Sequence, residues 1–165
     1  MPESTIVKTK RDGTITIEDL GAVNSFTVNF EAGDLSIEIP GATVNNFLDR
    51  GRLTSPPAIR YGDDQPITGS FTAYLRDLTD ATYATLTEII AQTGDVGTNW
   101  VSTMGATGEV FAVKIRWTIE GTDHGDPTDH ILELDHCYLT GSLSEGDPDT
   151  VSLSFTSYVL YPVLT

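Results

Sequence analysis

Residues 67–93, ITGSFTAYLRDLTDATYATLTEIIAQT, change their hydrophobic period once, and this change decides the expected fold. As far as Leu75, apolar side chains fall on alternate residues, which is typical of a strand with one buried face. From Leu78 onward they recur at steps of three and four residues, which is typical of one face of a helix. The stretch therefore predicts a half-buried strand followed by a helix over about residues 79–93.

The flanking residues predict where this helix begins and ends. Asp77 or Thr79 can accept hydrogen bonds from the first free amides, and Gly94 can adopt the left-handed conformation that ends a helix. Leu78 and Tyr83 belong to the expected apolar stripe. No other segment has a convincing helical period, so this one helix is expected to cover a sheet face or a barrel end.

The rest of the chain contains several short alternating segments, each typical of a strand. Residues 24–39 hold two such runs around the turn EAGD at 31–34, which predicts a β-hairpin with one apolar and one polar face. The remaining runs lie at residues 14–18, 111–119, 130–143 and 151–161. We therefore expect a single mainly β domain over residues 1–165, an antiparallel sandwich or barrel flanked by one helix.

Residues 40–66 interrupt the strand pattern with four prolines and three glycines. They also carry several apolar side chains and three of the nine basic residues, Arg50, Arg52 and Arg60. Long connections without secondary structure are uncommon inside a compact domain. We expect a loop that orders against another subunit; the alternative is a loop ordered against its own domain. The polar residues 1–13 and the apolar tail YPVLT are predicted to form extended arms.

The acidic composition excludes several classes of partner. The chain has 24 acidic and 9 basic residues, a formal net charge of −15. Binding to nucleic acids depends largely on Lys and Arg that neutralise phosphates, and anionic membranes attract basic segments. The sequence therefore predicts neither specific binding of nucleic acid nor binding to a membrane.

The residues with the strongest metal-binding character are His124, His130 and His136, at intervals of six residues with aspartates between them. Imidazole and carboxylate groups are good ligands for zinc or iron. On a regular strand, His130 and His136 would share a face but lie far apart. His124 belongs to a segment whose Asp, Gly and Pro residues are typical of a turn. We therefore expect a polar turn rather than a metal site, and no cofactor.

Cys137 is predicted to be a small buried side chain, on a strand whose apolar parity is set by Leu132, Leu134 and Tyr138. Its neighbour His136 would point to the opposite face, so the two do not form a nucleophile and base. The chain has no nucleophile elbow, phosphate loop, zinc-protease motif or dinucleotide fingerprint. The sequence therefore predicts that the protein is not an enzyme.

Two parts of the chain resemble phage tail tube proteins, also called major tail proteins of long-tailed bacteriophages. The run QPITGSFTAYLRD at 65–77, preceded by RGRLTSPPAIRYGDD and followed by the expected helix, is similar to the central part of that family. The runs VFAVKIRWTIEG and TVSLSFTSYVLYP, with an acidic loop between them, are similar to its second half. The resemblance covers roughly residues 20–162 and lies in pattern and order, without an invariant signature.

This resemblance implies a structural virion protein with a sandwich or barrel flanked by one helix. Six copies would form a ring, and stacked rings would form a tube whose channel passes the genome and the tape-measure protein. The implied partners are further copies of the chain, the tape-measure protein and the tail-tip or terminator proteins. Genomic DNA would pass without specific binding. The protein would be assembled in the host cytoplasm and located in the virion.

Three sets of residues are predicted to carry this assembly. The polar face of the 24–39 hairpin would line the channel, because an acidic surface repels phosphate; the alternative is an ordinary solvated face. The 40–66 loop would contact the next ring, and the C-terminal arm would contact the neighbouring protomer. The lumen candidates are Thr27, Asn29, Glu31, Ser36 and Glu38; the inter-ring candidates are Arg50, Arg52, Leu53, Arg60 and Tyr61; the arm candidates are Leu160, Tyr161, Val163 and Leu164.

Other functions are compatible with the same pattern. One is a related part of a virion or injection system, such as a tail terminator or a secretion-type tube. Another is a ligand-binding β-barrel, which would need an apolar cavity large enough for a small molecule. The third is a metal-dependent enzyme built around the three histidines.

Overall fold

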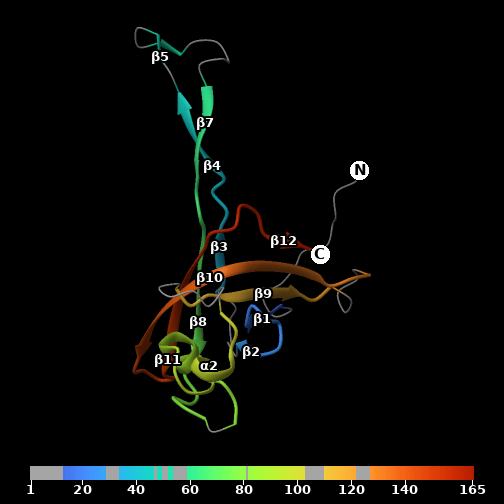
Figure 1. Cartoon of the computed structure of the whole chain (residues 1–165), viewed down its shortest axis with the longest axis vertical. Coiled ribbons are helices and arrows are strands. Elements are labelled where there is room, and N and C mark those ends of the chain that lie inside the picture. The colour runs from blue at the N-terminus through green and yellow to red at the C-terminus, as the bar shows by residue number, and fades with distance from the viewer. Residues whose placement is uncertain are drawn as a thin grey trace.

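The computed structural model describes residues 13–28, 34–46, 48–49, 52–53, 59–80, 82–102, 110–121 and 127–165 (Figure 1). The elements in these ranges are β1 Gly13–Glu18, β2 Ser25–Val28, β3 Ser36–Glu38, β4 Ala42–Asn46, β5 Leu48–Asp49, β6 Arg52–Leu53, β7 Ile59–Asp64, β8 Ile67–Tyr74, α1 Leu86–Ala91, α2 Gly94–Asn99, β9 Val113–Ile119, β10 His130–Ser144, β11 Thr150–Ser157 and β12 Val163–Leu164. The predicted fold class, mainly antiparallel β with a flanking helix, is confirmed.

One sheet of eight strands forms the body of the molecule, in the order β2-β1-β9-β10-β11-β8-β3, with β12 on β10. The long strand β10 pairs with β9 through its first half and with β11 through its second half. In Figure 1, β9 lies across the view while β8 runs along the long axis. Strand β10 therefore carries the sheet from one layer to the other, as strands at the corners of sandwiches do.

Strand β10 contains one extra residue at this bend. The three steps from Leu134 to Cys137 face only two steps on β9, and His136 has a φ of +53°, in the left-handed region. An extra residue exchanges the two faces of a strand. Leu134 points into the core, as predicted from the alternation of apolar residues. After the extra residue, Cys137 takes the next inward position, so the prediction that Tyr138 points inward is wrong. Tyr138 instead meets Tyr158 edge to face, with ring centroids 5.5 Å apart.

The inward faces predicted for the regular strands are confirmed. Strands β1, β8, β9 and β11 contribute alternate side chains to one buried cluster, to which α1 and α2 also add residues. The strand residues in it are Ile15, Ile17, Ile67, Phe71, Ala73, Val113, Ile115, Val151, Leu153 and Phe155. Full burial of a large apolar side chain contributes about 1.5–3 kcal/mol, so this cluster is the main source of the fold's stability.

Gly69 makes room for a core aromatic ring. It lies directly opposite Phe155 in the β8–β11 register, on the inward parity of β8. A Cβ at this position would collide with the Phe155 ring and with the carbonyl oxygen of Ser36 on β3. The ring thus fills the space that a side chain at residue 69 would need.

Replacement Gly69→Ala is expected to lower the free energy of unfolding by about 1–3 kcal/mol, the usual effect of overpacking. Urea unfolding followed by circular dichroism measures this difference. Ser70→Ala, at the exposed neighbouring position, is the matched control and should change stability by less than about 0.5 kcal/mol. Equal stability of the two variants would show that the sheet relaxes around the added methyl group.

The predicted helix over 79–93 is wrong in its extent. Helix α1 has six residues and begins after Thr85, whose side chain accepts a hydrogen bond from the Glu88 amide while Glu88 accepts one from the Thr85 amide. This capping box fixes the start of the helix. Upstream, Asp80 accepts hydrogen bonds from the amides of Thr82 and Tyr83, at 2.6 and 3.0 Å, and so holds them in a turn.

The predicted apolar face of this helix and the residue predicted to end it also differ from the structure. Leu78 and Tyr83 lie outside the helix and are exposed, at 56% and 73% of their surface. The left-handed residue that ends α1 is Gln92, with a φ of +56°. Gly94 is left-handed as predicted, but it is the first residue of a second short helix, α2. Two short helices therefore take the place of one.

The predicted hairpin over residues 24–39 is also wrong. Strand β2 pairs with β1, and β3 pairs with β8, so the two runs lie at opposite ends of the sheet order. Alternation shows that each run is a strand, but not which strand it pairs with. The turn residues 31–33 lie outside the described part of the chain.

The segment 40–66 contains strands where an irregular loop was predicted. Strands β4 and β7 pair as a separate antiparallel ribbon, and β5 pairs with β6 beyond it. Figure 1 shows β4 and β7 running away from the body, with β5 at the far end. We call the β4–β7 ribbon the arm.

Candidate assembly surfaces

The arm exposes an apolar pair. Val44 and Tyr61 lie directly opposite each other in the β4–β7 register, and 60% and 86% of their surfaces are exposed. Cross-strand partners point to the same face of a ribbon. An isolated two-stranded ribbon is only marginally stable in water, because it buries little apolar surface. This ribbon therefore has the character of a segment that gains stability by packing against a partner.

Two of the predicted inter-ring residues lie on the arm, and two lie on β6. Tyr61 is exposed on β7, and so is its neighbour Arg60, which pairs in register with Asn45. Arg52 and Leu53 form β6, where the backbone is described but the side chains are not. Arg50 lies outside the described residues. The structure thus places all the described members of this set on one projecting segment.

The predicted lumen residues are not brought together by strand pairing. Thr27 is on β2, at one end of the sheet order, whereas Ser36 and Glu38 are on β3, at the other end. All three are exposed, and Asn29 and Glu31 lie outside the described residues. The described strands do not form the single polar hairpin face that was predicted; Ser36 and Glu38 still share one face of β3.

The predicted C-terminal arm is partly wrong. Strand β12 pairs with Leu132 and Glu133 of β10, so the last residues lie along the sheet of their own domain. The side chains of Leu160, Tyr161, Val163 and Leu164 are nevertheless 50%, 71%, 51% and 69% exposed. With Tyr158, also 71% exposed, they form an apolar ridge. The N-terminal arm, residues 1–12, lies outside the description.

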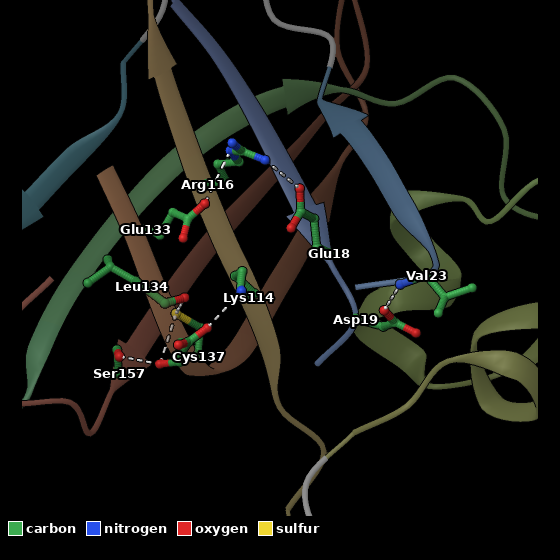
Figure 2. Close-up of polar contacts among 10 residues, drawn as sticks. Glu18, Asp19, Val23, Lys114, Arg116, Glu133, Leu134, Cys137 and Ser157 are labelled. Carbon is green, nitrogen blue, oxygen red and sulfur yellow. Dashed lines mark hydrogen bonds and ion pairs between the residues drawn. The ribbon is translucent and has the colours of Figure 1, made fainter. Parts of the chain in front are cut away.

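The outer face of the β1–β9–β10 sheet carries a ladder of alternating charges (Figure 2). Arg116 lies between Glu18 and Glu133, with nitrogen–oxygen distances of 3.6 and 3.3 Å, and Lys114 lies 3.4 Å from Asp135. Their side chains are 16–40% exposed, and ion pairs that water still reaches contribute little stability. Their main effect is that two of the few cations in the body are already neutralised by acids.

A buried carboxylate that the sequence analysis missed fastens one end of the sheet. Asp19 follows β1, is fully buried, and accepts hydrogen bonds from the amides of Val23, Asn24 and Val101 and from the Asn24 side chain, at 2.8–3.2 Å. Figure 2 shows the bond to Val23. Burial raises the pKa of Asp19, but the four hydrogen bonds together lower it by more. The pKa of Asp19 therefore lies below its ordinary value. The signal for this segment in the sequence is the presence of Asp19, Gly21 and Asn24, which are residue types common in turns.

Of the three histidines, the structure describes two. His130 is exposed at the start of β10, His136 is half-buried at the bulge, and His124 lies outside the described residues. Within the described ranges, no three His, Cys, Asp or Glu side chains gather closely enough to hold a metal ion. The bulge between His130 and His136 also removes the shared parity that a regular strand would have produced.

Cys137 is buried, as predicted, and its thiol donates to the carbonyl oxygen of Leu134 at 3.3 Å. Burial raises the pKa of the Cys137 thiol to about 12, so the reactive thiolate is scarce at neutral pH. Ser157 donates to the carbonyl oxygen of Asp135 at 2.6 Å. The first bond lies within the bulge of β10, and the second joins the bulge to β11 (Figure 2).

The described residues line two hollows that are large enough for a small molecule. The larger, about 930 Å³ and open to solvent, has Trp100 and Phe111 on its apolar side and Lys114, Asp135 and His136 on its polar side. The smaller, about 320 Å³, lies between Phe26 of β2, the end of β8 and the start of α1. Ligand pockets of small-molecule binders have volumes of about 300–1,000 Å³. The structure therefore meets the size requirement of the ligand-binding alternative.

No model of a known protein family matches this chain, and no curated protein matches it either. None of the helices in the described ranges has the length and apolar character needed to cross a membrane.

Proposed function

We propose that this chain is a structural subunit that assembles into stacked rings, as the tail tube protein of a long-tailed bacteriophage does. The observation that carries the proposal is the arm: a two-stranded ribbon with the exposed Val44–Tyr61 pair, running away from a β body. Exposed apolar groups on such a ribbon are typical of contact surfaces. In a stacked tube, the arm would pack against the next ring.

The charge of the chain supports this function in a second way. A tube that passes DNA has to avoid binding it, and the net charge of −15 repels phosphate. Lys114 and Arg116 lie next to carboxylates, which lowers their attraction for a passing phosphate. In this proposal the rings are hexamers, the tape-measure protein occupies the channel before the genome does, and tail-tip and terminator proteins close the ends. The protein would be assembled in the host cytoplasm and located in the virion.

The first test is negative-stain electron microscopy of purified protein at rising concentration and salt. We expect rings or tubes with a central hole, and we expect salt to favour them, because the repulsion between highly acidic subunits is screened within about 3 Å at 1 M ionic strength. Sedimentation measures the assembled fraction over the same series. A protein that stays monomeric throughout the series, even at the highest protein concentration, would count against the proposal.

The hollow beside Trp100 favours a second candidate, a ligand-binding module. An apolar wall with a few polar groups opposite is the usual form of a small-molecule site. Native mass spectrometry of freshly purified protein separates the two functions. A monomer that carries a small molecule of constant mass, and that never forms rings, would favour the binding module.

A further inference from the structure

The last strand, β12, contributes no side chain to the buried cluster of the described residues. Val159 is the last residue that packs against that cluster. Two backbone hydrogen bonds join Ile131 and Thr165, at 2.7 and 3.0 Å, and Val163 lies opposite Glu133 in the register. The net contribution of a backbone hydrogen bond to stability is small, because the released groups bond to water instead, so the release of β12 requires little free energy.

The stretch of β10 under β12 would be an open edge without it. Residues 131–133 pair with β9 on one side, and β11 covers the other side of β10 only from Cys137 onward. Strand β12 is therefore the element that covers residues 131–133 on that side. Uncovered strand edges recruit other strands through their free backbone groups.

The segment that leads to β12 has the composition of a contact surface. Residues 158–165 contain no charged side chain, in a chain with a net charge of −15. Tyr158, Leu160 and Tyr161 leave 50% or more of their surface in water while β12 lies on its own domain. The chain bends at Leu160 and Tyr161, and Pro162 follows before β12 begins.

We propose that β12 is exchanged between subunits: residues 163–165 of one copy pair with residues 131–133 of the next copy, in the register seen within one chain. This inference rests on the proposed ring. Exchange of an identical element keeps its hydrogen bonds and so costs little. It also places the ridge between two copies, where its apolar side chains are removed from water. Donor and acceptor are different surfaces, so the contact is head-to-tail and can close into a ring.

Disulfide trapping between two single variants tests the exchange. Glu133→Cys and Val163→Cys are mixed in equal amounts, assembled at high salt and oxidised. Residues opposite each other in antiparallel strands have Cα atoms about 4.5–5.5 Å apart, within the range that a disulfide spans. Since each chain has only one of the two new cysteines, a disulfide between residues 133 and 163 has to join two chains. We expect linked dimers on non-reducing gels in the assembled fraction.

A matched control uses Ser142→Cys in place of Glu133→Cys. Ser142 is exposed on the same strand but faces Ser152 of β11 rather than β12, so no linked dimer should form. The native Cys137 is fully buried and should not compete.

The outcomes separate this inference from the proposed function. Rings by electron microscopy without linked dimers, together with an intramolecular disulfide in the Glu133→Cys/Val163→Cys double variant, would overturn the exchange and leave the ring function standing. Linked dimers in closed two-copy particles would support the exchange and contradict the ring. A protein that assembles under no condition would overturn both.

Discussion

Replacement of both Val44 and Tyr61 by serine is expected to abolish tube formation while the subunit stays folded. Burial of an exposed Val or Tyr side chain contributes about 1.5–3 kcal/mol, so the double variant loses about 3–6 kcal/mol per contact. Since 1.4 kcal/mol corresponds to a factor of ten, each association constant falls by a factor of about 100 or more. Electron microscopy and sedimentation, at a concentration where the unmodified protein assembles, measure the loss.

The body of the molecule offers a matched control for this variant. Val23 and Tyr83 are exposed to a similar degree, 82% and 73%, and neither lies on the arm. The double variant Val23→Ser/Tyr83→Ser makes the same chemical change elsewhere and should assemble normally. Both variants should unfold in urea within about 0.5 kcal/mol of the unmodified protein, because all four side chains are exposed. Tubes of normal length from the arm variant would remove the arm from the proposed function.

Replacement of Asp19 by alanine is expected to lower the free energy of unfolding by about 3 kcal/mol or more. The change leaves the partly buried amides of Val23, Asn24 and Val101 without their acceptor, and an unsatisfied donor costs about 1–3 kcal/mol when it is shielded from water. Asp19→Asn keeps the shape and one acceptor oxygen, so its loss should be smaller, about 2 kcal/mol. Asp77→Asn, at an exposed position, is the control for the change in charge. Urea unfolding at pH 7 measures all three.

The Asp19 carboxylate also predicts a pH dependence. Its pKa is lower in the folded state than in the unfolded state, so its contribution is fully present above the unfolded pKa of about 3.9. The contribution is lost as the pH falls through the folded pKa. The stability difference between the unmodified protein and Asp19→Asn should therefore shrink below about pH 4. A difference that stays constant from pH 7 to pH 3 would contradict a carboxylate held in its charged form.

The strand faces could be predicted from the sequence wherever a strand is regular. Ile15 and Ile17, or Val113 and Ile115, are buried because alternate residues of a strand share a face. The same rule failed after Leu134, where one extra residue exchanged the faces of β10 and brought Cys137 inward in place of Tyr138. Nothing in the local composition marks this bulge. It occurs where β10 leaves β9 and joins β11, which is a property of the sheet.

The candidate surfaces were predicted in part. Tyr61 and the four tail residues Leu160, Tyr161, Val163 and Leu164 were named as contact candidates and are exposed, whereas Tyr158 was not named. The hairpin behind the lumen set was wrong, because Thr27 and Ser36 lie on strands at opposite ends of the sheet order. The ladder at Arg116 could not be predicted, since its partners Glu18 and Glu133 come from strands far apart in the chain.

The sequence by itself determined the mainly β class, the buried face of each regular strand and the acidic surface. These properties depend on the period of neighbouring residues and on composition, which are local. Only the tertiary structure decided which strands pair, where α1 begins, that β4 and β7 form the arm, and which end of the sheet Asp19 fastens. Each of these depends on hydrogen bonds or packing between residues distant in the chain, or on competing turns such as the one at Asp80. These interactions form together when the sheet packs around its core, so the sequence of any one segment does not determine them.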